Sequence, residues 1–177
     1  MQLVPYYLKY KEQKQLEEWT MLQCTDIIFD SNVDDWNQNT SVFNEKIIGK
    51  GQLVFLIEDE EGEKFGYYLH TEIIEKYDER IETDKKSFEF NLQSNGRLLT
   101  PMKFEVKDSK KGGYWLYENL YDYLIGLGDI MLWTEISKNK SHCLQNEDYF
   151  NYHGIENSLY GRPNNFTPKR ILVIRMK

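Results

Sequence analysis

Hydrophobic and polar residues alternate along much of this chain with a period of two, which is the spacing of a β-strand with one buried face. The clearest case is residues 85–92, where Phe88, Phe90 and Leu92 share one side and polar residues occupy the other. Similar runs predict further strands at 25–30, 52–57, 65–69, 102–106, 114–117, 120–125, 130–136 and 170–176. The last of these has a continuous apolar centre, which indicates a strand buried on both faces.

Turn signals separate the predicted strands at the spacing of β-hairpins. The acidic run 58–61, which a glycine follows, is interpreted as a solvated turn between two strands. Asn95-Gly96 is the strongest signal for a tight turn in the chain. Two longer segments are expected to be mostly irregular, namely 71–86 and 137–168.

Two helices are predicted in the first third of the chain. Pro5 suits the first turn of a helix that runs from Tyr6 to Trp19, because the missing N–H of proline would be unpaired there anyway. The apolar stripe of this helix is thin, which is typical either of a helix that rests on the domain or of the end of a longer upstream helix. Thr40 or Ser41 is expected to cap the second, shorter helix.

The predicted elements together indicate an α+β fold that is dominated by strands. We expect a sandwich of two mostly antiparallel sheets, flanked by a few short helices. Residues 1–20 are assigned to the amino-terminal helix and residues 21–177 to the sandwich domain. The length agrees, because 177 residues fit a single domain with a well-developed core.

Composition refines this picture in two ways. Aromatic residues make up 15% of the chain, with 13 Tyr, 9 Phe and 4 Trp, which favours sheet and provides amphipathic surface for contacts. The amino-terminal residues do not have the basic segment and apolar run of a signal peptide, and the apolar runs of the chain are too short to span a membrane. We therefore expect a cytoplasmic protein that does not insert into membranes, with nuclear entry left open.

The net charge of −7 is unevenly distributed. Residues 1–96 hold 10 Lys and Arg against 20 Asp and Glu, whereas residues 97–177 hold 12 against 9. The acidic half argues against broad, non-specific binding of nucleic acids. A local basic patch is nevertheless predicted at Lys169, Arg170, Arg175 and Lys177, with Lys138 and Lys140 as an extension. This patch is either the charged edge of a strand or a nucleic-acid-binding surface.

No residue pattern in the sequence indicates catalysis or metal binding. Asp30, Asn32 and Asp34 imitate the start of a calcium loop, but the glycine and the glutamate that such a loop needs are missing. The three histidines lack the spacing of metal ligands, and the sequence contains no nucleophile motif. The sequence therefore predicts a non-enzymatic protein that needs neither a cofactor nor a metal.

The two cysteines, Cys24 and Cys143, are too few for a disulfide framework. They are expected to be ordinary thiols in a reducing compartment. The alternative is a redox role, which requires an exposed thiol with a lowered pKa.

Several segments, in order along the chain, resemble the TLDc domain family. They are 27–31, 40–43, 53–57, Phe65-Gly66-Tyr67-Tyr68, 87–92, the glycine-containing 125–130 and 166–176. The resemblance extends over residues 19–177, and the ordered series of segments carries it. The turn 95–98 and the segment 166–170 are similar to those of divergent amoebozoan members of the family.

The resemblance implies a β-sandwich flanked by helices, which agrees with the elements predicted from the residue pattern. It marks Phe65, Gly66, Gly126 and Gly128 as positions of family motifs. Side chains in place of these glycines would obstruct tight bends or the close approach of strands. Members of the family are linked to protection against oxidative stress, and several bind the vacuolar proton-pumping ATPase.

Three functional hypotheses follow from the sequence. The leading one is a non-enzymatic protein-interaction domain in oxidative-stress protection, and the resemblance implies subunits of the vacuolar proton-pumping ATPase as its protein partner. The second is a stress-linked, nucleic-acid-binding regulator of transcription that uses the basic patch. The third is a thiol-based redox protein that uses Cys24 or Cys143.

Overall fold

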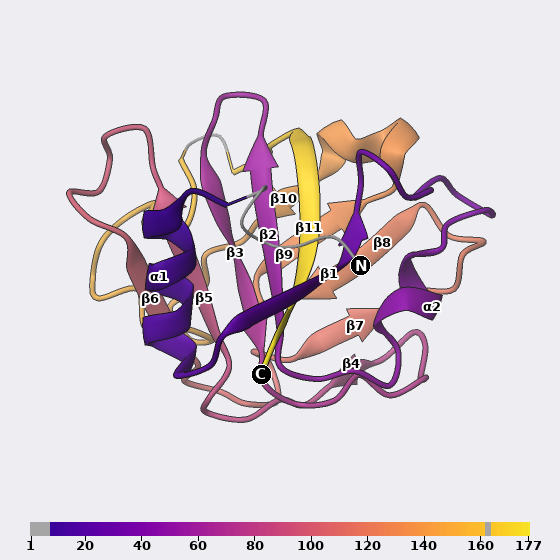
Figure 1. Cartoon of the computed structure of the whole chain (residues 1–177), viewed down its shortest axis with the longest axis horizontal. Coiled ribbons are helices and arrows are strands. Elements are labelled where there is room, and N and C mark those ends of the chain that lie inside the picture. Colours follow the sequence, from indigo (N-terminus) through magenta and orange to yellow (C-terminus); the bar gives the residue numbers. More distant parts are fainter. Residues whose placement is uncertain (1–7, 162–163) are drawn as a thin grey trace.

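Two antiparallel β-sheets pack face to face in the computed structural model, which describes residues 8–161 and 164–177 (Figure 1). Among these residues, sheet A has six strands in the order β1-β11-β2-β3-β5-β6. Their bounds are β1 Cys24–Asp30, β11 Pro168–Met176, β2 Leu53–Asp59, β3 Lys64–Leu69, β5 Phe88–Gln93 and β6 Met102–Glu105. In the same described residues, sheet B has five strands in the order β10-β9-β8-β7-β4, with bounds β10 His142–Cys143, β9 Ile130–Trp133, β8 Tyr123–Leu127, β7 Tyr114–Leu116 and β4 Arg80–Ile81. The predicted class, a strand-dominated α+β sandwich, is confirmed.

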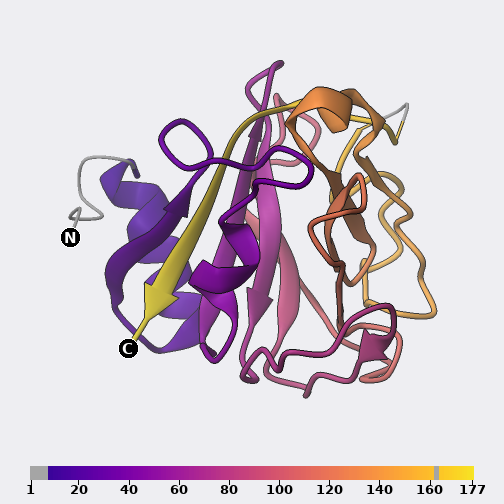
Figure 2. The same ribbon diagram turned by 90° about the vertical axis from the view of Figure 1, so that its right-hand side faces the viewer.

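The layers of the molecule run in the order helix, sheet A, sheet B (Figure 2). Helix α1, Tyr10–Thr20, lies on the outer face of sheet A, where Leu16 is fully buried and Trp19 packs edge-on against Phe88. The inner face of sheet A packs on sheet B, and neither α-helix lies on the outer face of sheet B (Figure 2). Within the described part of the chain, no helix has the length and apolar character that a membrane span requires.

Helix α2, Phe43–Ile47, lies at one side of the sandwich (Figure 1). The predicted cap at Thr40 or Ser41 is wrong by one or two residues, because the helix has Val42 at its N-cap without a side-chain capping bond. The Ser41 hydroxyl oxygen accepts the Phe43 N–H at 3.1 Å and so stabilises the turn that leads into the helix. Phe43 packs edge-on against Phe29 of β1, with ring centroids 4.8 Å apart. This short helix therefore closes the core between the two sheets at that side.

Strand β11 lies between β1 and β2 and is buried on both faces, as its apolar run predicts. Ile171 and Val173 enter the core shared with sheet B, whereas Leu172 and Ile174 enter the core under α1. Each fully buried branched side chain stabilises the fold by roughly 1.5–3 kcal/mol. The last strand therefore contributes to both cores of the molecule.

Helix α1 begins at Tyr10, later than the predicted start next to Pro5, which lies outside the described residues. Glu12 fixes the start, because its carboxylate accepts the Lys9 N–H at 3.1 Å and so satisfies an unpaired donor of the first turn. Glu12 Oε1 also lies 2.8 Å from Lys64 Nζ of β3. This ion pair explains how an acidic residue interrupts the apolar stripe and is still buried.

The predicted strand 130–136 is wrong in its second half, because Glu135–Lys140 forms the 3-10 helix η2. The hydroxyl groups of Thr134 and Ser137 each donate to the Asp122 carboxylate at 2.5 Å. These two hydrogen bonds hold the chain in a tight turn where the sequence pattern alone favours an extended strand.

Other predicted boundaries also need correction. The two segments expected to be irregular contain the short strands β4 and β10, which pair at the edges of sheet B. The predicted strand 120–125 begins later, at Tyr123. Asn95 and Gly96 form the predicted turn, with φ values of 52° and 89°, but the turn lies within a longer connection between β5 and β6.

Replacing Gly66 by alanine is expected to prevent folding. Gly66 lies inside sheet A, and a Cβ atom there would stand 1.9 Å from the carbonyl oxygen of Phe55. Backbone atoms of paired strands cannot relieve such a clash without breaking the sheet. We expect Gly66→Ala to lower the free energy of unfolding by more than about 3 kcal/mol, measured by urea denaturation.

Gly161→Ala is the matched control for this experiment. The added Cβ atom would meet side-chain atoms of Arg97 at 3.4 Å and beyond, which is ordinary contact. The free energy of unfolding of this control should fall by less than about 0.5 kcal/mol. An equal loss in the two variants would show that the close approach at Gly66 is not the cause.

Candidate functional site

The outer face of sheet B carries a row of residues in register across its strands. Arg80 of β4, Trp115 of β7, Gly126 of β8, Met131 of β9 and His142 of β10 are successive cross-strand partners. Directly opposed residues point to the same face of a sheet, so these positions share one surface. Their neighbours along the central strands point the other way and enter the core.

Aromatic rings form a continuous line on this outer face. We call the residues Trp115, Tyr117, Tyr123 and Trp133 the aromatic row. Successive ring centroids are 6.0 Å, 4.8 Å and 4.3 Å apart in that order. Such ring pairs contribute about 0.5–1.5 kcal/mol each beyond the burial of their area. Tyr123 is 36% exposed, and the other three residues are half-buried.

Gly126 lies beneath the aromatic row. A Cβ atom at this position would stand 3.2 Å from Cβ of Trp115 and 3.3 Å from Cε of Met131. These are tight contacts, so a side chain here would push the two neighbours apart. The glycine that the family resemblance marks at 126 therefore allows Trp115 and Met131 to close over the strand between them.

Cations lie over both ends of the aromatic row. Arg80 Cζ is 5.7 Å from the ring centroid of Trp115, and Lys140 Nζ is 4.9 Å from that of Trp133. Burial raises the pKa of Tyr117 to about 12, so its hydroxyl group stays neutral at physiological pH. The face therefore presents apolar ring surface with Arg80 at one end, and at the other end Lys140, whose ammonium group also lies 3.8 Å from Asp122 Oδ2. Trp, Tyr and Arg are the residues that dominate binding energy in protein interfaces.

A second cluster lies inside the sandwich, between the sheets. Glu89 of β5 and Asp129 of the β8–β9 turn are 0% and 2% exposed. The Tyr152 hydroxyl oxygen lies 2.5 Å from Glu89 Oε2 and 2.8 Å from Asp129 Oδ2. Glu89 Oε1 also accepts the Asp129 N–H at 2.7 Å. Three polar side chains thereby join sheet A, sheet B and the segment 144–161.

These distances show where a proton must lie. The Tyr152 hydroxyl group has one hydrogen and donates it to one carboxylate, so the other contact is favourable when the second carboxyl group is protonated and donates to the Tyr152 oxygen. Burial, together with the nearby charge of Asp129, raises the pKa of Glu89 well above its usual range. Burial also raises the pKa of Asp129 to about 6. The pair therefore holds a shared proton near neutral pH.

Gly128 makes room for this carboxyl pair. Its φ is +56°, in the left-handed region, and a Cβ atom there would stand 2.5 Å from Cζ of Phe150 and 2.7 Å from Glu89 Oε1. Any side chain would displace either the ring or the carboxylate. The structure thus gives a physical reason for the second glycine of the 125–130 motif.

Polar side chains also anchor the segment 144–161, which the sequence predicts as irregular. Asn91 Nδ2 donates to the Leu159 carbonyl oxygen at 2.9 Å, and Asp129 Oδ2 accepts the Asn146 N–H at 2.6 Å. Gln145 Oε1 accepts the Leu159 N–H at 3.0 Å. Polar side chains therefore replace regular strand pairing in holding this segment in place.

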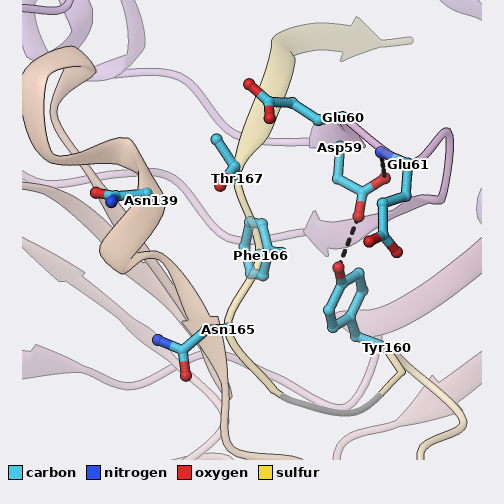
Figure 3. Close-up of a pocket in the computed structure, with 8 residues that line it drawn as sticks. All are labelled: Asp59, Glu60, Glu61, Asn139, Tyr160, Asn165, Phe166 and Thr167. Carbon is cyan, nitrogen blue, oxygen red and sulfur yellow. Dashed lines mark hydrogen bonds between the residues drawn. The ribbon is translucent and has the colours of Figure 1, made fainter.

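Phe65, the first residue of the other family motif, is fully buried against Tyr160 and Phe166, with ring centroids 5.0 Å and 4.9 Å away. Beside them is a polar pocket of about 260 Å³, where the Tyr160 hydroxyl group points at Asp59 (Figure 3). Asp59 is 1% exposed and accepts this hydroxyl at 2.7 Å. The prediction that the run 58–61 is a solvated turn is therefore wrong for Asp59, which stabilises the turn from inside.

The structure divides the predicted basic patch between the two ends of β11. Lys169 and Arg170 lie near its start, and Arg175 and Lys177 lie near its end, roughly 17 Å away at about 3.3 Å per residue. The ion pairs of these residues are Arg170–Asp30 at 2.5 Å, Lys169–Glu58 at 3.4 Å and Lys177–Asp26 at 3.9 Å. The four residues therefore do not form one continuous cationic surface.

The two cysteines lie in different sheets, Cys24 in β1 and Cys143 in β10, and both are free thiols. Burial raises the pKa of Cys24 to about 12 and raises that of Cys143 well above its usual value. A raised pKa lowers the thiolate fraction, which is the opposite of what a reactive redox thiol needs.

The segment that imitates a calcium loop is a hydrogen-bonded turn. Asp30 Oδ1 accepts the Asn32 N–H at 3.0 Å, and Asp34 Oδ2 accepts the Asp30 N–H at 2.9 Å. In residues 8–161 and 164–177, no group of three His, Cys, Asp or Glu side chains is arranged to hold a metal ion.

Neither the aromatic row nor the carboxyl pair was identified from the sequence. One available signal was the run 114–117, which is apolar or aromatic at every position although a sheet with one covered face should alternate. A weaker one was Asp129, which directly follows a glycine of the family motif. The partners of both sites come from segments far apart in the chain, and the fold brings them together.

Comparison with known families agrees with this architecture. A model of the TLDc domain matches residues 6–171. The matched region includes the aromatic row, the carboxyl pair and the glycines at 66, 126 and 128. Among curated proteins, none matches the chain.

Replacing Glu89 by glutamine is expected to reduce the pH dependence of stability. Raised carboxyl pKa values mean that the folded protein binds more protons than the unfolded chain, so this contribution is complete below about pH 4. It is lost as the pH rises through the pKa of the pair, which is about 6 for Asp129. Between pH 5 and 8, the free energy of unfolding of Glu89→Gln, measured by urea denaturation, should therefore fall less than that of the wild type.

Glu45→Gln, at an exposed position of α2, is the matched control. It should follow the wild type at every pH, because it removes a carboxyl group from the surface. If Glu89→Gln kept the full pH dependence of the wild type, the shared proton would be contradicted.

Proposed function

The chain belongs to the TLDc domain family, and on that premise we propose that it is a non-enzymatic protein-interaction domain that docks through the aromatic row of sheet B. One observation carries the proposal: the row stays partly exposed on a sheet face that neither α-helix covers (Figure 2). Aromatic residues beside an arginine are the usual centre of a protein interface. The opposite face of the sandwich differs, because α1 covers it.

The aromatic row is already ordered in the free protein. Each ring packs against the next, and Gly126 lets Trp115 settle against the strand. A partner would therefore immobilise few side chains when it covers the row, and the entropy cost of binding would be low. Arg80 and Lys140 at the ends favour a partner patch that is apolar at its centre and acidic at its rim.

We propose subunits of the vacuolar proton-pumping ATPase as the partner and protection against oxidative stress as the role. Both come from the resemblance of this chain to other TLDc proteins, and the aromatic row is a surface of the kind that such a contact needs. The proposal implies a cytoplasmic location.

The burial of the carboxyl pair also supports a non-enzymatic role. Glu89 and Asp129 have the raised pKa values that acid–base catalysts use, but they are closed off from solvent inside the sandwich. Both carboxyl groups contact the Tyr152 hydroxyl group, and Glu89 also accepts the Asp129 N–H. We therefore assign the pair to the connection between the sheets.

Trp133→Ala is expected to weaken binding of the full chain to the purified peripheral sector of the vacuolar ATPase, measured by biolayer interferometry. Truncating an aromatic ring that the partner buries costs about 2 kcal/mol or more, which is about 30-fold in Kd. Tyr123→Ala removes a more exposed ring and should weaken binding in the same direction. Melting temperatures of both variants show whether they remain folded.

Tyr10→Ala is the matched control, because Tyr10 is 74% exposed on α1, on the opposite side of the sandwich. It should bind as the wild type does. Unchanged binding by Trp133→Ala and Tyr123→Ala would contradict the docking face. Catalytic turnover of hydrogen peroxide by the purified protein would contradict the non-enzymatic role.

A further inference from the structure

A groove of about 490 Å³ lies on the side of the molecule away from the aromatic row, between the end of α1 and sheet A. Its floor is apolar, because Trp19 of α1 packs edge-on against Phe88 of β5 with ring centroids 6.1 Å apart. Tyr68 of β3 continues this floor, and its ring centroid is 5.1 Å from that of Phe88. The groove is thus large enough for a side chain of a partner and has an apolar surface to receive it.

Three lysines surround this apolar floor, namely Lys85, Lys86 and Lys103. Lys103 Nζ lies 5.4 Å from the ring centroid of Phe88, and Lys85 Nζ donates to the Val106 carbonyl oxygen at 3.1 Å. Across the part of the chain that the structure describes, none of the three lysines forms a salt bridge with a carboxylate. Lys85 Nζ also donates to the Lys107 carbonyl oxygen, so Lys86 and Lys103 are the lysines best placed to pair with an acidic ligand.

Besides the lysines, the groove has two other ionisable side chains, His70 and Glu105. His70 Nδ1 lies 2.6 Å from Asp84 Oδ2, and Glu105 Oε2 lies 3.5 Å from His153 Nε2. Three lysines against one glutamate leave the groove locally cationic in a chain whose net charge is −7. This local reversal of sign favours an acidic ligand and disfavours a basic one.

Met21 forms the rim of the groove, where α1 ends. Its side chain is 85% exposed, and its backbone has a left-handed φ of 58° at the end of the helix. An exposed methionine is an unbranched, adaptable apolar contact. The rim therefore extends the apolar floor outward, toward the place where a ligand would enter.

We propose that this groove binds an acidic segment of a protein partner, in which an apolar side chain lies between carboxylates. The apolar side chain covers the floor formed by Trp19 and Phe88, and the carboxylates pair with the surrounding lysines. Charge complementarity selects this occupant. Phe88 is 3% exposed, so the apolar side chain contacts mainly the partly exposed Trp19 and the exposed Met21. Binding of a nucleic acid is the alternative outcome that the test separates.

The inference rests on the proposed function in one respect, that the chain acts by binding proteins. The groove and the aromatic row lie on opposite sides of the sandwich, so each surface can be tested without the other. If the protein did not bind the ATPase sector, the proposal for the groove would be unaffected. If the groove did not bind the acidic probe, the proposal for the aromatic row would be unaffected.

The probe is a random copolymer of glutamate and tyrosine, which presents acidic residues around an aromatic anchor in many arrangements. Titrated into the isotopically labelled full chain at low salt, it should shift the NMR amide signals of residues 19–22, 85–88 and 103. The double variant Lys86→Glu, Lys103→Glu should weaken its apparent Kd at least about tenfold, since each lost charge contact is worth up to about 1 kcal/mol and each new one repels.

The matched control is the double variant Lys11→Glu, Lys110→Glu, which changes the net charge equally at exposed positions outside the groove. It should bind the copolymer within about twofold of the wild type, as should Trp133→Ala. Equal weakening in both double variants, or shifts confined to sheet B, would overturn the proposal. If polyglutamate bound as tightly as the copolymer, the apolar side chain would not be part of the ligand. If a single-stranded oligonucleotide bound more tightly than the copolymer, the ligand would be a nucleic acid and not a protein segment.

Discussion

Sheet A buries both of its faces, and the rest of the molecule is arranged around that constraint. Its inner face needs sheet B and its outer face needs α1, so a strand such as β11 carries apolar residues at successive positions. Sheet B buries its inner face against sheet A, and neither α-helix covers its other face. The aromatic row is therefore left half-buried, ordered by its own ring contacts and by the gap at Gly126. The proposed docking surface is therefore a consequence of how the core is covered.

Polar groups inside the sandwich determine how the two sheets are joined. An unpaired buried charge would cost several kcal/mol, so Glu89 is compatible with the core because Asp129 and Tyr152 satisfy its oxygens and share a proton. Asp129 also lies in the turn between β8 and β9, the two strands that carry Tyr123 and Trp133 of the aromatic row. The internal polar cluster and the external aromatic surface therefore depend on the same hairpin.

The fold class and most strands could be predicted from the sequence, because alternation and turn residues are local signals. Prediction failed where distant side chains decide the local structure. Hydrogen bonds to Asp122 stabilise residues 135–140 as a 3-10 helix. The sequence pattern places Glu89 on the polar side of a strand, but its hydrogen bond with Tyr152 allows it to be buried. Gly113 looks in the sequence like any turn glycine, yet a Cβ atom there would stand 1.8 Å from the Ile81 carbonyl oxygen. The aromatic row could not be predicted from the sequence for the same reason. Its residues come together only because of the order and register in which the strands of sheet B pair.

Hydroxyl-radical footprinting of the full chain, free and bound to the peripheral sector of the vacuolar ATPase, tests the central claim most directly. Aromatic side chains are among the most readily oxidised, and the proposed docking face is built from them. The account predicts that oxidation of Trp115, Tyr123 and Trp133 falls on binding, while oxidation of Tyr10 on α1 does not change. Unchanged oxidation of the aromatic row together with protection of Tyr10 would contradict it, and would move the docking surface to the helical side of the molecule.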